Sequence, residues 1–131
     1  MQDLIPAHII TTQGRQPLAI QLAQTTWQRF KGLMLSAPLP TLPLPQGLLI
    51  TRCTSVHGFL MRYPLDLVYL SADHTVTHTA HLKPWRISFS QSYTSTQPPM
   101  TRYKTAHTLE LPTGTLEALG IAPGDKLELS P

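Results

Sequence analysis

The chain has 131 residues, of which 41% are hydrophobic and 13% are charged, and it carries a net charge of +3. The apolar content is that of a globular protein and argues against disorder, and the length fits a single domain, residues 1–131, with a core of its own. The ten basic residues are scattered singly and no stretch approaches about twenty apolar residues, so we expect neither a nucleic-acid partner nor insertion into a membrane.

Residues 1–16 are expected to form a strand or an arm ahead of the core. The opening run, MQDLIPAHII, has an acid where a secretory signal has lysine or arginine, and Pro6 and His8 interrupt its apolar residues. The chain has one cysteine and therefore no internal disulfide, which suits a reducing compartment. We therefore expect a cytoplasmic location.

The next segments predict a strand, a short helix and an extended loop. PLAIQLAQ (17–24) alternates large apolar residues with Ala and Gln, which is the period of a half-buried strand. Thr25 or Thr26 can cap a helix over WQRFKGLM (27–34), because its large apolar residues recur at helical spacing. SAPLPTLPLPQ (36–46) is too rich in proline for a helix and is expected to run as a surface loop.

Strand-like runs dominate the rest of the chain. GLLITRCTSV (47–56) is rich in residues that favour strands. LDLVYLSADHTVTHTAHL (65–82) holds two such runs on either side of a short connection, Ser71–His74, which predicts a hairpin. KTAHTLELP (104–112) predicts another strand, and Pro112 ends it.

The carboxyl-terminal segment predicts a short helix and a last strand. The helix can start at Thr113–Gly114 and run to Leu119, and Gly120 occupies the position that ends helices in a left-handed turn. A turn at 123–125 then precedes the final strand, KLELS. Taken together, the pattern predicts a mainly β fold: a compact β-sandwich or small barrel of about six to eight strands with two short α-helices.

Three soft-metal ligand types stand at equal intervals in the middle of the chain: Cys53, His57 and Met61. A thiolate, an imidazole and a thioether together suit copper, and a Cys/His pair can also serve nucleophilic catalysis. In an extended strand, however, Cys53 and His57 would lie about 13 Å apart, too far to share an ion. The plainer interpretation is that Cys53 and Met61 fill the core, while His57 can equally be a core histidine or line the mouth of a pocket.

Asp66 lies between two leucines at the start of a predicted buried strand. A carboxylate in that position needs hydrogen-bond donors, and the expected ones are Arg52, Arg62 or the backbone amides of the preceding turn. Trp85 can belong to the core or form the wall of a shallow ligand groove. The histidines that follow are interpreted as surface residues: His74, His78 and His81.

Three blocks of the sequence carry a family resemblance. They are AIQLAQTTWQRFKGLM (19–34), GLLITRCTSVHGFLMRYPLDLVYL (47–70) and HTLELPTGTLEALGIAPGDKLEL (107–129), with HLKPWRISF (81–89) between the last two. With these blocks the chain resembles the domain of unknown function 192 family, a widespread prokaryotic group, over a core of residues 17–129. The resemblance implies a compact β-sandwich or barrel-like domain, and it implies no reaction because the family has no established one.

The middle block resembles the family signature C-x-x-[VI]-H-T-x-x-M-x-x-P-[LI]-D, and the last block resembles its ending motif. Two departures from the family pattern stand out: Gly58 replaces the usual threonine after the histidine, and Leu35-Ser36 replaces the usual arginine after GLM. Residues that fall on the two motifs are Cys53, His57, Met61, Pro64, Asp66, Glu110 and Gly114.

Polar and aromatic residues set in core-like sequence, without a complete catalytic set, favour a non-enzymatic binding or accessory module. Its site would lie around His57, Asp66 and Trp85, and its partner would be a small ligand or a protein segment. No cofactor and no resident metal are expected. The alternatives are a thiol-dependent enzyme built on the Cys/His pair and a copper site on the same pair with the methionine. Further candidate binding residues are Cys53, Met61 and Arg62.

Overall fold

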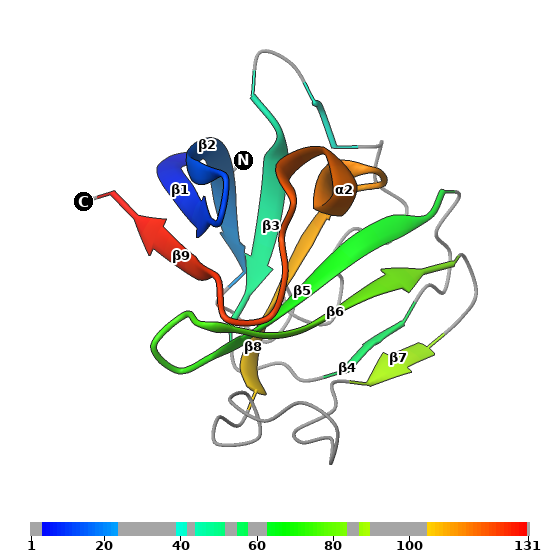
Figure 1. The fold of residues 1–131 in the computed structure, drawn as a ribbon. Helices are drawn as coiled ribbons and strands as arrows, with labels where there is room; N and C mark the ends of the chain where they lie inside the picture. Colours follow the sequence, from blue (N-terminus) through cyan, green and yellow to red (C-terminus); the bar gives the residue numbers. More distant parts are fainter. Residues whose placement is uncertain are drawn as a thin grey trace.

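The computed structural model describes residues 4–23, 39–41, 44–51, 55–57, 63–83, 87–89 and 105–130. These residues form mostly strands and one short helix (Figure 1). The elements are β1 (Ile5–Thr11), β2 (Gly14–Ala23), β3 (Gln46–Ile50), β4 (Ser55–His57), β5 (Leu65–Ser71), β6 (Val76–Leu82), β7 (Ile87–Phe89), β8 (Thr105–Pro112), α2 (Thr115–Leu119) and β9 (Lys126–Leu129). In the described part of the chain, no helix is long and apolar enough to span a membrane.

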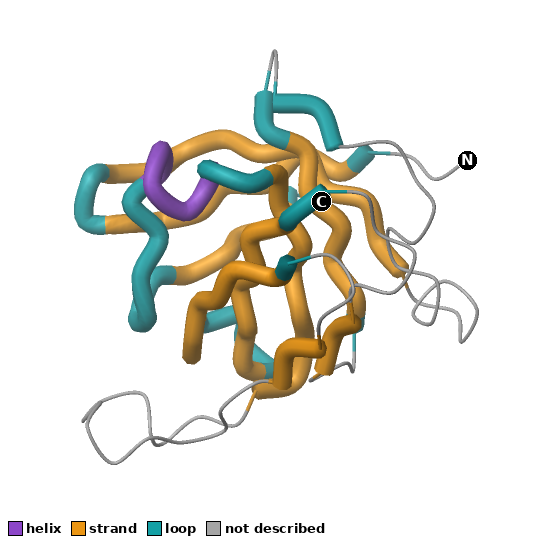
Figure 2. The backbone as a smooth tube through the Cα atoms, turned by 90° about the vertical axis from the view of Figure 1, so that its right-hand side faces the viewer, coloured by secondary structure: helices purple, strands orange, loops and turns teal. Residues whose placement is uncertain are grey.

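Seven strands form one large sheet in the order β6-β5-β8-β3-β2-β1-β9, and β4 pairs with β7 in a separate two-stranded sheet. Neighbours in the large sheet are antiparallel except β2 and β3, which run parallel. Tight hairpins join β1 to β2 and β5 to β6. Figure 2 shows that strands make up most of the described backbone and that short loops and turns connect them. The parallel pair instead needs a long crossover, which residues 24–45 supply.

The two edges of the large sheet meet where the β5–β6 hairpin touches the turn before β9. The amide of Val76 donates to the carbonyl oxygen of Asp125 at 2.7 Å, and the amide of Leu127 donates to that of His74 at 3.0 Å. In Figure 1 the chain leading into β9 crosses the hairpin at this point. The sheet is therefore curled into a half-barrel, which confirms the predicted mainly β fold of sandwich or small-barrel type.

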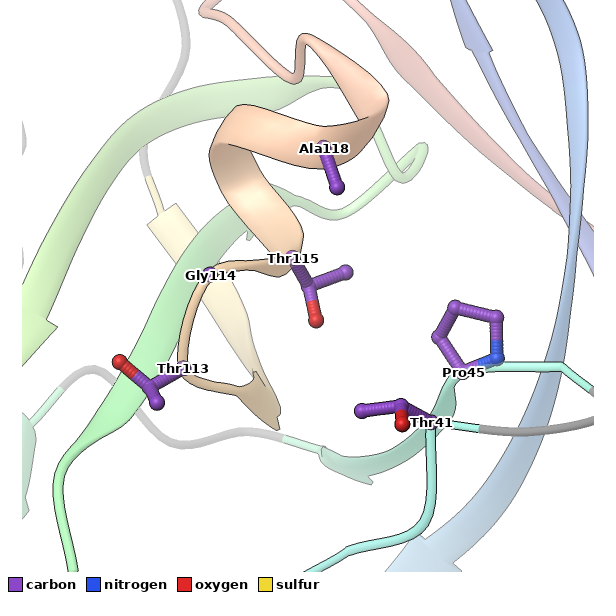
Figure 3. A pocket seen from close by; sticks show the side chains of 6 residues that line it. All are labelled: Thr41, Pro45, Thr113, Gly114, Thr115 and Ala118. Carbon is purple, nitrogen blue, oxygen red and sulfur yellow. The ribbon is translucent and has the colours of Figure 1, made fainter.

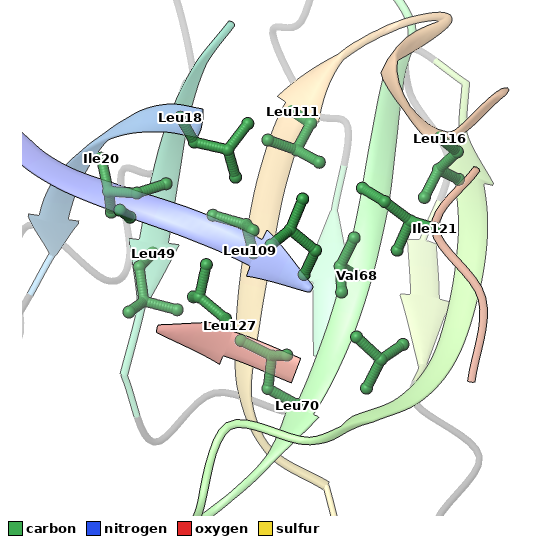
Figure 4. Close-up of a cluster of buried hydrophobic side chains, with 13 residues drawn as sticks. Leu18, Ile20, Leu49, Val68, Leu70, Leu109, Leu111, Leu116, Ile121 and Leu127 are labelled. Atoms are coloured by element: carbon green, nitrogen blue, oxygen red, sulfur yellow. The ribbon is translucent and has the colours of Figure 1, made fainter. Parts of the chain in front are cut away.

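The inner face of the half-barrel holds the main hydrophobic core. Alternate side chains of β5 and β8 point inward, where they pack against β1, β2, β3 and β9 (Figure 4). Leu116 of α2 and Ile121, just beyond the helix, complete this cluster. The period-two pattern of the strands thus supplies one continuous apolar interior, whose burial is the main stabilising contribution to such a fold.

The outer face of β6, β5, β8 and β3 is also buried. The strand registers place Ala80, Leu67, Glu110 and Leu48 in one row across these four strands. Because both faces are covered, all seven residues of β5 are buried, and its sequence is a nearly continuous apolar run. The apolar cluster on this face consists of Ala23, Leu39, Leu48, Ile50, Leu65, Leu67, Tyr69 and Leu82.

Most elements expected from the sequence are confirmed. The alternating segment 17–24 lies almost entirely in β2, and the connection 71–74 joins β5 to β6. Helix α2 ends as expected, with Gly120 in the left-handed conformation at φ 66°. The run 47–56 is divided, however, because β3 ends at Ile50 and β4 begins at Ser55. The helix expected over 27–34 lies outside the described residues.

Candidate functional site

One end of the large sheet gathers four strand termini and the only described helix. The registers bring the first residues of β3 and β5 next to the last residues of β6 and β8; Leu65, for example, lies between Leu82 and Pro112. Two residues, Thr113 and Gly114, separate the end of β8 from the start of α2. We call this region the α2 end of the sheet.

Asp66, the second residue of β5, is completely buried at the α2 end. Its Oδ1 lies 2.8 Å from Nδ1 of His81, which stands directly opposite on β6. Its Oδ2 accepts a 2.9 Å hydrogen bond from the backbone amide of Leu116. Both carboxylate oxygens therefore have partners, which offsets the cost of burying the group.

These two partners differ from the donors expected for Asp66. The sequence pointed to arginine side chains or to the turn before β5, but within the described residues the donors come from β6 and α2. Arg52 and Arg62 lie outside the described residues. Asp66 therefore joins three elements of the fold and does more than hold its own turn together.

Asp66 also acts as a remote cap for α2. The residue at the N-cap position, Gly114, has no side chain, and no local side chain caps the helix. The first amides of a helix lack partners within the helix, and the amide of Leu116 is one of them. The carboxylate of Asp66 satisfies this amide from the neighbouring strand.

His81 is held at the surface in a defined orientation. Its side chain is 61% exposed, although its partner is fully buried. Because a carboxylate only accepts hydrogen bonds, Nδ1 of the ring carries the proton, and Nε2 of the neutral ring is left as an acceptor. The interpretation of His81 as a surface residue is confirmed, but no local pattern in the sequence indicates its link to Asp66.

A pocket of about 300 Å³ opens beside α2 (Figure 3). In the figure, Thr115 and Ala118 face Thr41 and Pro45 across the open space. Thr115 directly precedes Leu116, so the pocket and the Asp66–His81 pair border the same turn of the helix. Methyl groups and hydroxyls line this pocket, and its size suits a small ligand or one or two side chains of a peptide. Its full lining is Thr41, Pro45, Thr113, Gly114, Thr115 and Ala118.

Of the residues expected at the site, Asp66 is described in full and His57 by its backbone. His57 is the last residue of β4 and pairs with Ile87 of β7. Ile87 directly follows Arg86 in the sequence, and Trp85 lies two positions before it. The side chain of His57 lies outside the described part, as do four other candidates: Cys53, Met61, Arg62 and Trp85.

Glu110, which was not among the predicted site residues, is the second buried carboxyl of the sheet. Its side chain is 2% exposed, and among the described residues its Oε2 has no hydrogen-bond partner. Burial raises the pKa of Glu110 to about 8. A sequence signal was present, because Glu110 falls on the family's ending motif and lies between two leucines in a predicted strand.

A metal centre and a thiol site remain predictions. Among the residues that the structure describes, no three His, Cys, Asp or Glu side chains gather as a metal site. The copper and thiol-enzyme hypotheses concern the side chains of Cys53, His57 and Met61, which lie outside that part of the chain.

Comparisons with known proteins agree on one family. The sequence profile of the DUF192 family, described as uncharacterised ACR, matches residues 8–129. The UPF0127 protein PF1050 of Pyrococcus furiosus is 31% identical over 118 residues, which cover 89% of this chain and 92% of that protein.

Two crystal structures share the fold. One is a protein of unknown function from Novosphingobium aromaticivorans, with 25% identity, a TM-score of 0.77 and coverage of 95% of this chain and 84% of that one. The other, from Sinorhizobium meliloti, is named as a candidate transcription regulator, with 27% identity, a TM-score of 0.78 and coverage of 98% and 95%. The same half-barrel architecture thus occurs in related bacterial proteins.

Proposed function

The chain belongs to the domain of unknown function 192 family, and we propose that it serves as a non-enzymatic binding module whose site lies at the α2 end of the sheet. The partner is a small ligand or an extended protein segment. The described part of the site consists of the Asp66–His81 pair and the pocket beside α2. The proposal also includes the signature and aromatic residues His57, Trp85, Cys53, Met61 and Arg62.

The hydrogen bond between Asp66 and His81 carries this proposal. A hydrogen bond or ion pair to a well-exposed side chain adds little stability. Asp66 also stabilises the fold as the cap of α2 without any help from His81, so stability alone does not account for the bond between them. The additional effect of the bond is to fix which ring nitrogen of His81 faces solvent. A surface acceptor with a fixed direction suits a partner that donates a hydrogen bond, such as an amide, a hydroxyl or an amine.

The pocket supplies the complementary apolar contact. Its methyl-bearing wall lies along the first turn of α2, which is the turn that Asp66 holds in place. A ligand that donates to Nε2 of His81 and places a small apolar group against Thr115 and Ala118 would use both features. Because the same carboxylate orients the imidazole and anchors the helix, the site is preorganised and binding needs little ordering of the protein.

The variant His81→Phe is expected to weaken binding at this site at least about tenfold, because it keeps a ring of similar size and removes the acceptor. The measurement is a titration of the ¹⁵N-labelled protein with a panel of N-methylamides and primary amines, followed by amide shifts in the NMR spectrum. In the wild type, the compounds that bind should shift the amides of residues 113–118.

His78→Phe is the matched control, since His78 lies on the same strand but stacks on Tyr69 at the outer face. It should bind the same compounds as the wild type does. Equal affinities in the two phenylalanine variants, or shifts that avoid residues 113–118 altogether, would refute the proposed site.

A further inference from the structure

His81 presents one ring nitrogen to solvent and keeps the other on a buried carboxylate. Its Nδ1 lies 2.8 Å from Oδ1 of Asp66, which is completely buried, whereas the histidine side chain is 61% exposed. With the proton on Nδ1, the lone pair of Nε2 can attack an electrophile as well as accept a hydrogen bond. The pair therefore has the arrangement of an oriented nucleophile at the protein surface.

Asp66 also places charge where such an attack needs it. When a neutral imidazole attacks through Nε2, the ring becomes positively charged and retains the proton on Nδ1. The carboxylate of Asp66 lies beside that proton and is held in place, because its other oxygen accepts from the amide of Leu116. A fixed negative charge next to the developing positive charge stabilises the product of the attack. The hydrogen bond that orients the ring therefore also favours its reaction.

The other histidines lack this combination. Among the histidine side chains that the structure describes, His81 is the only exposed one, and the remaining four are partly buried. His78 stacks on an aromatic ring, and the rings of His74 and His107 pack edge to face with their centroids 5.4 Å apart. Exposure and the buried carboxylate together distinguish His81.

The neighbourhood of His81 favours the transfer of an anionic group. Lys83 directly follows β6, and strand alternation places it on the same face as His81. It is exposed, and at the spacing of a strand the two Cα atoms lie about 7 Å apart. The ammonium of a flexible lysine can reach a phosphoryl group on Nε2, whereas a neutral acyl group gains nothing from it.

We propose that His81 is a phosphoryl-acceptor site, at which Nε2 takes a phosphoryl group from a small activated donor, an acyl phosphate or a phosphoramidate. Nε2 forms a bond to phosphorus while the donor's own bond to phosphorus breaks, and the carboxylate or the amine leaves with the bonding electrons. The ring keeps its proton on Nδ1, where Asp66 accepts the hydrogen bond. The site depends on this pair and needs no ligand in the pocket beside α2, so it is independent of the function proposed above.

Phosphoramidate is the probe, incubated with the folded wild-type protein at about pH 8, where ordinary imidazoles are neutral. Phosphorus NMR distinguishes phosphohistidine substituted on Nε2 from phosphohistidine substituted on Nδ1, and tandem mass spectrometry identifies the modified residue. The expected product carries its phosphoryl group on Nε2 of His81, because Nδ1 is occupied by the bond to Asp66.

Asp66→Asn tests the role of the carboxylate. Its amide donates to Nδ1, so Nε2 carries the proton and phosphorylation should be at least about tenfold slower. Urea denaturation checks that this variant is folded. Lys83→Gln should slow transfer from phosphoramidate about threefold, which is the size expected of an exposed charge, and should leave modification by the neutral acyl donor diethyl pyrocarbonate unchanged. His78→Phe is the matched control and should react with phosphoramidate as the wild type does.

The proposal is overturned if His81 stays unmodified, if the product is a mixture of the two ring isomers, or if either Asp66→Asn or Lys83→Gln is phosphorylated as fast as the wild type. It is also overturned if diethyl pyrocarbonate modifies His81 and phosphoramidate does not, because the site would then accept acyl groups only. These results leave the titration with N-methylamides unaffected, so failure of the phosphoryl-acceptor site and failure of the binding site are distinguishable.

Discussion

The contribution of Glu110 to the free energy of unfolding is expected to fall by about 1.4 kcal/mol for each pH unit between pH 4.5 and about 8. The folded protein holds the proton of Glu110 up to about pH 8, because burial opposes ionisation, whereas the unfolded chain releases it near pH 4.5. The folded state therefore binds more protons in this window, so stability is full below it and is lost as the pH rises through it. Over the whole window the effect amounts to several kcal/mol, a large share of the stability of a small domain.

The measurement is urea denaturation at a series of pH values for the wild type and for Glu110→Gln. The glutamine cannot ionise, so the difference between the two free energies should change steadily across the window and become constant above about pH 8. His74 and His78, whose pKa values are lowered mainly by burial, act in the opposite direction at mildly acid pH, but they are present in both proteins and cancel. Parallel stability curves for the two proteins would contradict a proton held by Glu110.

Asp66→Ala is expected to destabilise the fold by about 2–4 kcal/mol, because it removes a helix cap and leaves a buried amide unpaired. The amide of Leu116 has no other acceptor among the described residues, and Leu116 itself belongs to the inner core. Loss of the cap should therefore loosen α2 and the part of the core that it covers. Thermal or urea denaturation measures the loss, and hydrogen exchange at the amide of Leu116 locates it.

Asp66→Asn and His81→Ala separate the two bonds of Asp66. The asparagine oxygen can still accept from Leu116, so most of the stability should be kept in Asp66→Asn. His81→Ala removes an exposed partner and should cost less than about 1 kcal/mol. If His81→Ala were as damaging as Asp66→Ala, the pair would be a stabilising element of the fold and would no longer point to a surface site.

The strands and the short helix could be predicted because their signals are local. The alternation of β2, the hairpin residues around Ser71–His74 and the left-handed glycine after α2 each act over a few positions. The curling of the sheet could not be predicted, because it depends on bonds between a hairpin and a turn about fifty residues further along.

The partner of Asp66 could not be predicted because it depends on an irregularity in the hairpin. A regular four-residue connection over 71–74 would pair Leu70 with Thr75 and would place Thr79 opposite Asp66. In the structure Leu70 pairs with Val76, one position further along, and the register shifts by one more position between Tyr69 and Leu70, so that His81 stands opposite Asp66 instead. Such a bulge changes the cross-strand partner of every residue beyond it, and no local sequence pattern predicts it.

The burial of Glu110 could not be predicted for a different reason. Alternation in the strand Thr105–Pro112 correctly places the two leucines on one face and Thr108 and Glu110 on the other. The face of Thr108 and Glu110 points away from the inner core. That side is itself buried in the structure, and its cover comes from parts of the chain distant in sequence, such as Leu39. Periodicity indicates which residues share a face, but it does not indicate whether that face is exposed.

The central claim is that Asp66 fixes the ring of His81 so that Nε2 faces solvent as an acceptor. The most direct test is the NMR spectrum of the His81 ring nitrogens at about pH 8, where an ordinary imidazole is neutral. The wild type should show the tautomer with the proton on Nδ1, and Asp66→Asn should show the reverse, because the asparagine amide donates to Nδ1. A wild-type ring protonated on Nε2, or one that averages between tautomers as in free histidine, would contradict the claim.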